Sequence, residues 1–203
     1  REIKQLENAG CQIVRLAVPD MEAARALGEI RKNVNIPIVS DIHFDYRLAL
    51  EAVEQGVTLI DTADVYGFGH SEELIARLIR ERGKGNLVIA TKAGNDFYNA
   101  TSEDDKGYGP IRQTYDAGYL VEAAEKSLKR LGVECIDILQ LHSPDLKNLE
   151  RDDPWIALER LKRDGKIRHA GWSVQSFRET EQAHILERHR ELIDCIQVRY
   201  NLL

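Results

Sequence analysis

Short apolar runs rich in Val, Ile and Leu alternate along this chain with longer stretches in which apolar residues recur every three or four positions. The short runs predict buried strands, and the longer period predicts amphipathic helices. Seven strands are expected, over residues 12–18, 36–42, 57–63, 87–93, 136–142, 169–175 and 193–200. The intervening helices are expected over residues 21–34, 46–56, 71–83, 117–132, 154–165 and 177–192. This alternation indicates parallel strands joined by helices.

The repeated strand and helix unit predicts an α/β fold of the TIM (β/α) barrel type, forming a single domain over residues 1–203. A doubly wound open sheet is the alternative. No GxGxxG motif follows the first strand, which disfavours that alternative. Because a complete barrel has eight strands, seven recognisable ones predict an incomplete or rearranged closure.

Composition narrows the function to small-molecule chemistry. Of 203 residues, 43% are hydrophobic and 31% charged, and the net charge of −6 is spread without a basic block. Neither nucleic acid nor an anionic membrane is therefore expected as a partner. No apolar run approaches the roughly 20 residues of a membrane span, so a cytoplasmic protein is expected. Cys11, Cys135 and Cys195 are isolated in sequence, which favours buried thiols over a zinc or redox site.

Polar residues end several of the otherwise apolar strands. Asp61, Lys92 and His142 lie at or near the ends of three strands, and Tyr66 follows the first of these. In a parallel barrel the carboxyl ends of the strands form the active-site mouth. We therefore expect these four side chains to meet there.

Such a set has a specific chemistry. A nearby Lys92 ammonium should lower the pKa of Tyr66 and make it a usable proton donor, while Asp61 keeps the lysine charged. His142 would then orient a carbonyl oxygen. Taken singly, each residue has a structural alternative, such as a strand-end lysine reaching solvent or a hydrogen-bonded core histidine.

Residues 57–203 carry the motifs TLIDTADVYGFGHSEELI, VIATKAG, SLKRLGVECIDILQLHSPD, LKRDGKIRHAGWSVQS and IQVRYNLL, and this part of the chain resembles the aldo-keto reductase family. The resemblance implies a reduction of aldehydes or ketones by NADPH in which Tyr66 protonates the carbonyl oxygen. It also implies that Ser173 and Gln197 bind the carboxamide of the cofactor. The residues matching the family's catalytic tetrad are Asp61, Tyr66, Lys92 and His142.

Residues 1–56 carry different motifs, QIVRLAVPDMEAARAL and NIPIVSDIHFDYRLALEAVEQGV, which resemble the barrel domain of 4-hydroxy-3-methylbut-2-enyl diphosphate synthase. That resemblance implies diphosphate binding by Arg15, Asp41 and His43. The family's cluster-binding domain has no counterpart here, so no iron-sulfur cluster is expected. The structural alternative is that these residues cap a strand and form ion pairs. The chain thus looks like a chimera of two TIM barrels.

Three functions follow from these motifs: a weak or vestigial NADPH-dependent carbonyl oxidoreductase, a catalytically inert scaffold, and a diphosphate-binding module. In the reductase numbering of strands, the seventh has no counterpart, and we find no replacement for the family's grip on the 2′-phosphate. Strands 12–18 and 193–200 should therefore close imperfectly or mediate a homodimer or domain swap. Arg15 belongs to the other family's segment, so it is expected to contribute little to reduction.

Overall fold

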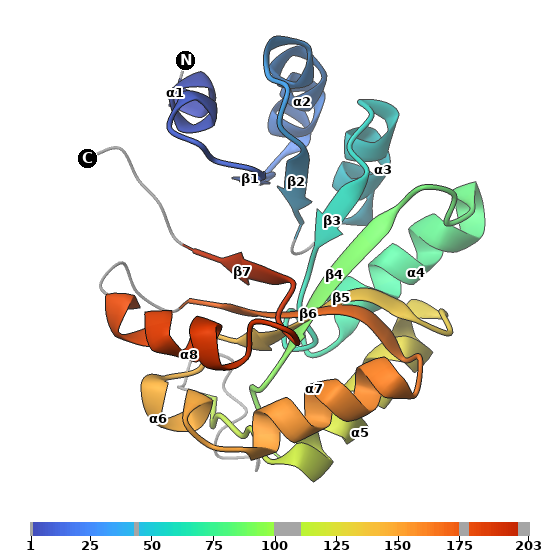
Figure 1. The fold of residues 1–203 in the computed structure, drawn as a ribbon. Coiled ribbons are helices and arrows are strands. Elements are labelled where there is room, and N and C mark those ends of the chain that lie inside the picture. The colour runs from blue at the N-terminus through green and yellow to red at the C-terminus, as the bar shows by residue number, and fades with distance from the viewer. Residues whose placement is uncertain (1, 43–44, 100–110, 175–178, 199–203) are drawn as a thin grey trace.

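All seven strands belong to one parallel sheet, in which spatial order follows chain order from β1 to β7. The computed structural model describes residues 2–42, 45–99, 111–174 and 179–198. The sheet curls into a partial barrel (Figure 1). Its strands are β1 (Val14–Ala17), β2 (Ile38–Asp41), β3 (Leu59–Asp61), β4 (Val88–Ala93), β5 (Ile136–His142), β6 (Ile167–Ser173) and β7 (Cys195–Gln197).

The helices lie along the outer side of the curled sheet (Figure 1). They are α1 (Glu2–Asn8), α2 (Met21–Asn33), α3 (Tyr46–Glu54), α4 (His70–Arg82), α5 (Ala117–Leu131), α6 (Leu146–Leu149), α7 (Asp153–Arg163) and α8 (Ala183–Arg188). Local sequence explains where several of them begin and end. The Asp20 carboxylate accepts a hydrogen bond from the amide of Ala23 and caps α2, while Gly132 ends α5 in a left-handed conformation.

The core lies between the sheet and this helical layer. Side chains of the strands, such as Ile60, Ile89 and Leu139, are 0–1% exposed. Burying an aliphatic side chain of this size stabilises the fold by about 1.5–3 kcal/mol. Because the helical layer covers the sheet, the strands have nearly continuous apolar sequences. Trp172 of β6 packs edge-on against Trp155 of α7, with 6.0 Å between their ring centroids.

The sheet is open between its first and last strands. Within the described residues, β1 pairs only with β2 and β7 pairs only with β6. The predicted incomplete closure is therefore confirmed. Exposed apolar side chains flank both edges: Ile13 precedes β1 and is 50% exposed, and Val198 follows β7 and is 62% exposed.

The backbones of β6 and β7 approach each other closely at Gly171. A Cβ built on Gly171 of β6 would lie only 2.2 Å from the carbonyl oxygen of Cys195, so no larger residue fits there. The resulting pairing sets Ser173 opposite Gln197.

Each strand overlaps its predicted range, but α6 lies outside the predicted helical ranges and the last predicted helix is divided. Residues 177–192 do not form one continuous helix, because a 3-10 turn over Glu179–Gln182 precedes the short α8. The buried Gln182 side chain accepts a hydrogen bond from Trp172 Nε1 at 2.9 Å and donates one to the carbonyl of Pro144 at 3.3 Å. These contacts fix the first turn against β6.

Candidate active site

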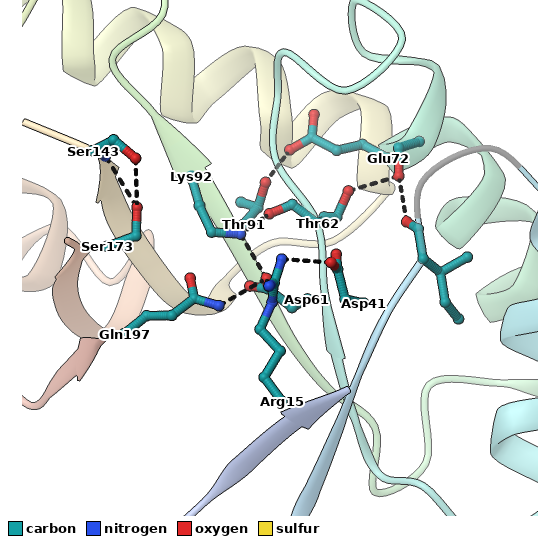
Figure 2. Close-up of polar contacts among 12 residues, drawn as sticks. Arg15, Asp41, Asp61, Thr62, Glu72, Thr91, Lys92, Ser143, Ser173 and Gln197 are labelled. Atoms are coloured by element: carbon teal, nitrogen blue, oxygen red, sulfur yellow. Dashed lines mark hydrogen bonds and ion pairs between the residues drawn. The ribbon is translucent and has the colours of Figure 1, made fainter. Parts of the chain in front are cut away.

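The carboxyl ends of the strands gather the polar side chains at one mouth (Figure 2). The register of the sheet accounts for this, since Asp41 lies opposite Asp61, and Ser173 lies opposite both His142 and Gln197. Parallel strands in register bring their last residues to the same edge. Lys92 reaches the same place from β4.

Asp61 is the centre of the mouth. Its Oδ2 atom accepts hydrogen bonds from Arg15 Nε at 2.6 Å, Lys92 Nζ at 2.7 Å and Gln197 Nε2 at 3.2 Å. The Asp61 side chain is only 2% exposed. Burial alone would raise the pKa of Asp61, but the charges of Lys92 and Arg15 outweigh burial and hold the pKa below its ordinary value. Asp61 is therefore an ionised carboxylate in a poorly solvated site.

Lys92 is held by two acceptors. Its Nζ donates to Asp61 and, at 2.7 Å, to the backbone carbonyl of Thr62. Burial lowers the pKa of Lys92, and the Asp61 carboxylate opposes that effect. The lysine is thus oriented towards β3.

Tyr66 and His142 adjoin this pair. The Lys92 nitrogen lies 5.5 Å from the centroid of the Tyr66 ring, and the rings of Tyr66 and His142 meet edge-on with centroids 5.8 Å apart. The structure therefore brings together the four residues that the sequence analysis expects to meet.

The expected lowering of the tyrosine pKa is wrong. Burial, followed by the charges of Asp61 and Asp41, raises the pKa of Tyr66 to about 12, although Arg15 acts in the opposite direction. The Lys92 ammonium already donates to a carboxylate and a carbonyl, so the negative charges of Asp61 and Asp41 have the larger effect on the pKa of the phenol. Tyr66 is therefore a neutral phenol over the physiological pH range.

His142 is also neutral. Burial, followed by the charge of Lys92, lowers its pKa to about 3. Its Nδ1 atom is buried and has no hydrogen-bond partner among the described residues. The Tyr115 hydroxyl donates to the backbone carbonyl of His142 at 2.6 Å and fixes the end of β5. A neutral imidazole can polarise a carbonyl oxygen by hydrogen bonding without protonating it.

Arg15 lies inside the mouth and links two carboxylates. Its Nη2 atom is 2.6 Å from Asp41 Oδ2, in addition to the Nε bond to Asp61. This arrangement corresponds to the ion-pairing alternative for Arg15 and Asp41. It also removes the reason for expecting Arg15 to contribute little, because the side chain contacts the tetrad directly. The third residue of the expected diphosphate site, His43, lies outside the described residues.

Ser173 and Gln197, the residues expected to bind the cofactor carboxamide, lie on adjacent strands. The Ser173 hydroxyl accepts a hydrogen bond from the amide of Ser143 at 3.0 Å, to one side of the charged cluster (Figure 2). Ser143 has a left-handed backbone with φ of 55°, a strained conformation for a non-glycine residue. A hydroxyl and a primary amide at one edge match the donors and acceptors of a carboxamide, so these two residues fit the nicotinamide end of NADPH.

A second buried polar network lies behind the mouth, and the sequence analysis missed it. Glu72 of α4 is 0% exposed and accepts hydrogen bonds from Thr91 Oγ1 and Arg130 Nε, each at 2.6 Å (Figure 2 shows the Thr91 bond). Arg130 also donates to the Tyr98 hydroxyl at 2.6 Å. A signal for this network is present in the sequence. Glu72 lies three positions before the buried Ile75, on the apolar face of its helix.

Comparison with known families divides the chain in two overlapping parts. Residues 42–203 match the family model described as aldo/keto reductase family, and residues 1–81 match the GcpE TIM-barrel domain. The N-terminal part is 54% identical over 84 residues to a 4-hydroxy-3-methylbut-2-en-1-yl diphosphate synthase (flavodoxin) of Bacillus cytotoxicus, covering 40% of this chain and 23% of that protein. The chain therefore joins segments similar to two TIM-barrel families, as the motifs predict.

Several solved structures of aldo-keto reductases are similar to 73–94% of this chain. One from Bacillus halodurans has a TM-score of 0.62 at 27% identity, covering 78% of this chain and 50% of that one. The glycerol dehydrogenase of Gluconobacter oxydans has a TM-score of 0.62 at 30% identity, covering 94% and 52%. An aldo-keto reductase of Klebsiella pneumoniae, in complex with NADPH, has a TM-score of 0.54 at 28% identity, covering 73% and 45%. This chain thus spans about half the length of these relatives.

Among the helices of the described residues, none combines the length and apolar character of a membrane span. Within the same described ranges, His, Cys, Asp and Glu side chains form no group of three or more that could hold a metal ion.

Proposed function

The chain belongs to the aldo/keto reductase family, and from that premise we propose that its mouth reduces the carbonyl group of a small molecule with NADPH as the electron donor. One observation carries the proposal: Asp61, Lys92, Tyr66 and His142 converge in a poorly solvated site, with an ionised acid, a buried lysine, a neutral phenol and a neutral imidazole. We propose a low turnover, because the sheet that surrounds the site is open between β1 and β7.

In this proposal Tyr66 holds the proton that the carbonyl oxygen receives. When bound, NADPH supplies a hydride to the carbonyl carbon. The oxygen then becomes an alkoxide with a basicity comparable to that of hydroxide, whose conjugate acid, water, is a much weaker acid than a phenol. A phenol with a pKa of about 12 is more acidic than water, so the proton passes from Tyr66 to the alkoxide.

The neighbouring side chains orient the reactants. His142, which is neutral, would donate a hydrogen bond to the carbonyl oxygen and so fix its direction. Lys92 and Asp61 form an ion pair, which provides fixed charges beside the phenol. Ser173 and Gln197 would hold the carboxamide of the cofactor.

The test is an assay of NADPH consumption with small aldehydes and ketones, followed through the nicotinamide absorbance. The unaltered chain should consume NADPH in proportion to added carbonyl, and Tyr66→Phe should remove nearly all of this activity, by about 10²- to 10⁴-fold. Tyr46→Phe is the matched control, because Tyr46 belongs to α3 and its ring stacks under Arg77. Equal rates for the unaltered chain and Tyr66→Phe would contradict the proposal.

A second candidate, an inert scaffold, is favoured by one specific observation. The two edge strands β1 and β7 each lack a pairing partner on one side within the described residues, and apolar Ile13 and Val198 are exposed beside them. Such edges favour association of two copies. Light scattering should then show a dimer, and the carbonyl assay should show no reduction at millimolar NADPH.

The third reading, a diphosphate-binding module, has weaker support. Arg15, its main cation, already pairs with Asp41 and Asp61, so a diphosphate would have to displace two carboxylates that lie 2.6 Å from the guanidinium.

A further inference from the structure

Arg15 is fixed in the mouth by strands of both parts of the chain. It extends from the edge strand β1, past β2, to a carboxylate on β3. Its bonds to Asp41 and Asp61 engage two different guanidinium nitrogens. About a third of the Arg15 side chain, 34%, is still exposed. The guanidinium therefore has a defined position and an open side.

Arg15 also interacts with Tyr66. Its positive charge favours the ionised form of the phenol and so acts against the burial and the two carboxylates that raise the Tyr66 pKa. Lys92 differs in this respect, because its nitrogen is directed to Asp61 and the Thr62 carbonyl and lies 5.5 Å from the centre of the tyrosine ring. The cation that bridges Asp41 and Asp61 thus comes from the segment similar to the diphosphate synthases.

The charge balance of the mouth depends on the same residue. Within the part of the chain that the structure describes, the charged and titratable groups near Tyr66 include Asp61, Asp41, Arg15, Lys92 and the neutral His142. Two carboxylates are balanced by two cations. Asp41 and Arg15 both come from the N-terminal segment, so that segment adds one charge of each sign. Without Arg15, the carboxylates would outnumber the cations beside the phenol.

We propose that Arg15 is a positioning residue of the mouth, which holds the Asp41 and Asp61 carboxylates together and supplies the positive charge that balances them beside Tyr66. Its relevance to catalysis rests on the proposed function, but the contact itself does not. A purely structural role, in which Arg15 only ties β1 to β3, would affect stability and leave the state of Tyr66 unchanged.

The direct test is nuclear magnetic resonance of the protein with ¹³C-labelled tyrosine rings, without cofactor or substrate. Tyr66→Phe identifies the Tyr66 signal. Arg15→Met should move that signal at neutral pH and raise the midpoint of its alkaline titration. Asp41→Asn should lower the midpoint, because it removes a negative charge. The double variant should lie between the two single variants. Opposite shifts for the two charges are the signature of electrostatic coupling.

Arg77→Met is the matched control. Arg77 lies 4.2 Å from the centre of the Tyr46 ring, so its removal should move the Tyr46 signal and leave that of Tyr66 in place. Arg15→Lys should restore part of the shift, because a lysine retains the charge but not the planar two-sided contact.

The outcomes separate this proposal from the proposed function. A Tyr66 signal unchanged in a folded Arg15→Met protein would overturn the role of Arg15. If Arg15→Met does not fold, an unchanged titration in Asp41→Asn would overturn it as well. If the Tyr66 signal moves as expected while no carbonyl is reduced, the Arg15 contact stands and the reductase proposal fails.

In the carbonyl assay, Arg15→Met should lower kcat by about tenfold, with a smaller change in KM, and move the alkaline limb of the pH profile upward. One pKa unit at the proton donor corresponds to about a factor of ten in its proton equilibrium. An active Arg15→Met protein with an unaltered kcat and pH profile would contradict the proposal.

Discussion

Two buried aspartates at opposite ends of the same sheet have very different surroundings. Asp137, near the start of β5, accepts hydrogen bonds through Oδ2 from Lys84 Nζ at 2.7 Å and from the amide of Ile89 at 3.0 Å, and its Oδ1 pairs with Arg168. Asp61, at the end of β3, directs one oxygen atom to three donors. Each oxygen of Asp137 therefore has its own partners, whereas a single oxygen of Asp61 accepts three hydrogen bonds.

The groups around each aspartate explain the difference. Asp137 meets two partly exposed cations and a backbone amide, which is sufficient to fasten the ends of β4, β5 and β6. Asp61 shares the mouth with the phenol of Tyr66, whose pKa is raised to about 12, and the imidazole of His142, whose pKa is lowered to about 3. Strongly shifted groups are typical of functional sites, and in barrels those sites lie at the carboxyl ends of the strands. From this comparison we expect stability to depend on the end with Asp137 and the proposed chemistry on the end with Asp61.

The largest expected effect is a difference between Lys92 and Lys84, the two lysines that pair with these aspartates. Lys92→Met should lower the rate of carbonyl reduction by about 10²-fold or more, because Asp61 then loses one of its two cations and adds negative charge beside the proton donor. It should also destabilise the fold by about 3 kcal/mol, the usual cost of removing one partner of a buried ion pair. Steady-state kinetics and urea unfolding measure the two effects.

Lys84→Met is the control for this prediction, since Lys84 pairs with Asp137 at the far end and is 29% exposed. It should leave the rate unchanged and cost less stability. Equal losses of rate in both variants would show that the two ends do not differ in function.

A change at Asp137 should have the opposite profile. Asp137→Ala removes the acceptor for Lys84, Arg168 and the Ile89 amide, which leaves a buried backbone donor without its partner. We expect a loss of about 3 kcal/mol in the free energy of unfolding. The rate per folded molecule should stay within about twofold of the unaltered chain. A large fall in that rate would assign Asp137 to the chemistry and remove the contrast.

Per pH unit, a smaller effect comes from the titration of His142. Its folded pKa of about 3 lies below the ordinary value of 6.5, so its contribution to stability is complete above pH 6.5 and is lost as the pH falls towards 3. The associated slope cannot exceed about 1.4 kcal/mol per pH unit. Unfolding free energies measured at several pH values should fall less steeply for His142→Gln than for the unaltered chain. Parallel curves would mean that His142 is not held neutral by burial.

The smallest effect concerns Asp64, just beyond β3. Burial, followed by the nearby charge of Glu72, raises the pKa of Asp64 well above its ordinary value. Its contribution to stability is therefore present below the ordinary pKa and is lost as the pH rises through the folded pKa. Asp64→Asn should stabilise the protein by about 1 kcal/mol at neutral pH and by less under acidic conditions. Thermal unfolding at two pH values measures this, and a stabilisation independent of pH would contradict the explanation.

The sequence predicted the sheet and the location of the mouth well for a simple reason. Strands buried on both faces appear as short apolar runs, and parallel strands bring their carboxyl ends together, so Asp61, Lys92 and His142 could be placed from their positions alone. Incomplete closure could also be predicted, because it depends on the number of strands.

The electrostatics of the mouth could not be predicted in the same way. The pKa of Tyr66 depends on Asp41 and Arg15, which reach it from β2 and β1 and lie more than twenty positions away in sequence. Which atom of Asp61 each cation contacts depends on side-chain conformations that no pattern of residues encodes. The bond between Glu72 and Arg130 was missed because it joins two helices across the layer behind the sheet.

One measurement tests the central claim, that the carboxyl end of the sheet performs hydride-transfer chemistry. The purified chain is incubated with a small aldehyde and NADPH that carries deuterium at the transferable position, and the alcohol is analysed by mass spectrometry. We expect one deuterium in the alcohol from the unaltered chain and from Lys84→Met, and none above background from Tyr66→Phe. Alcohol without deuterium from the unaltered chain, or equal labelling with Tyr66→Phe, would contradict it.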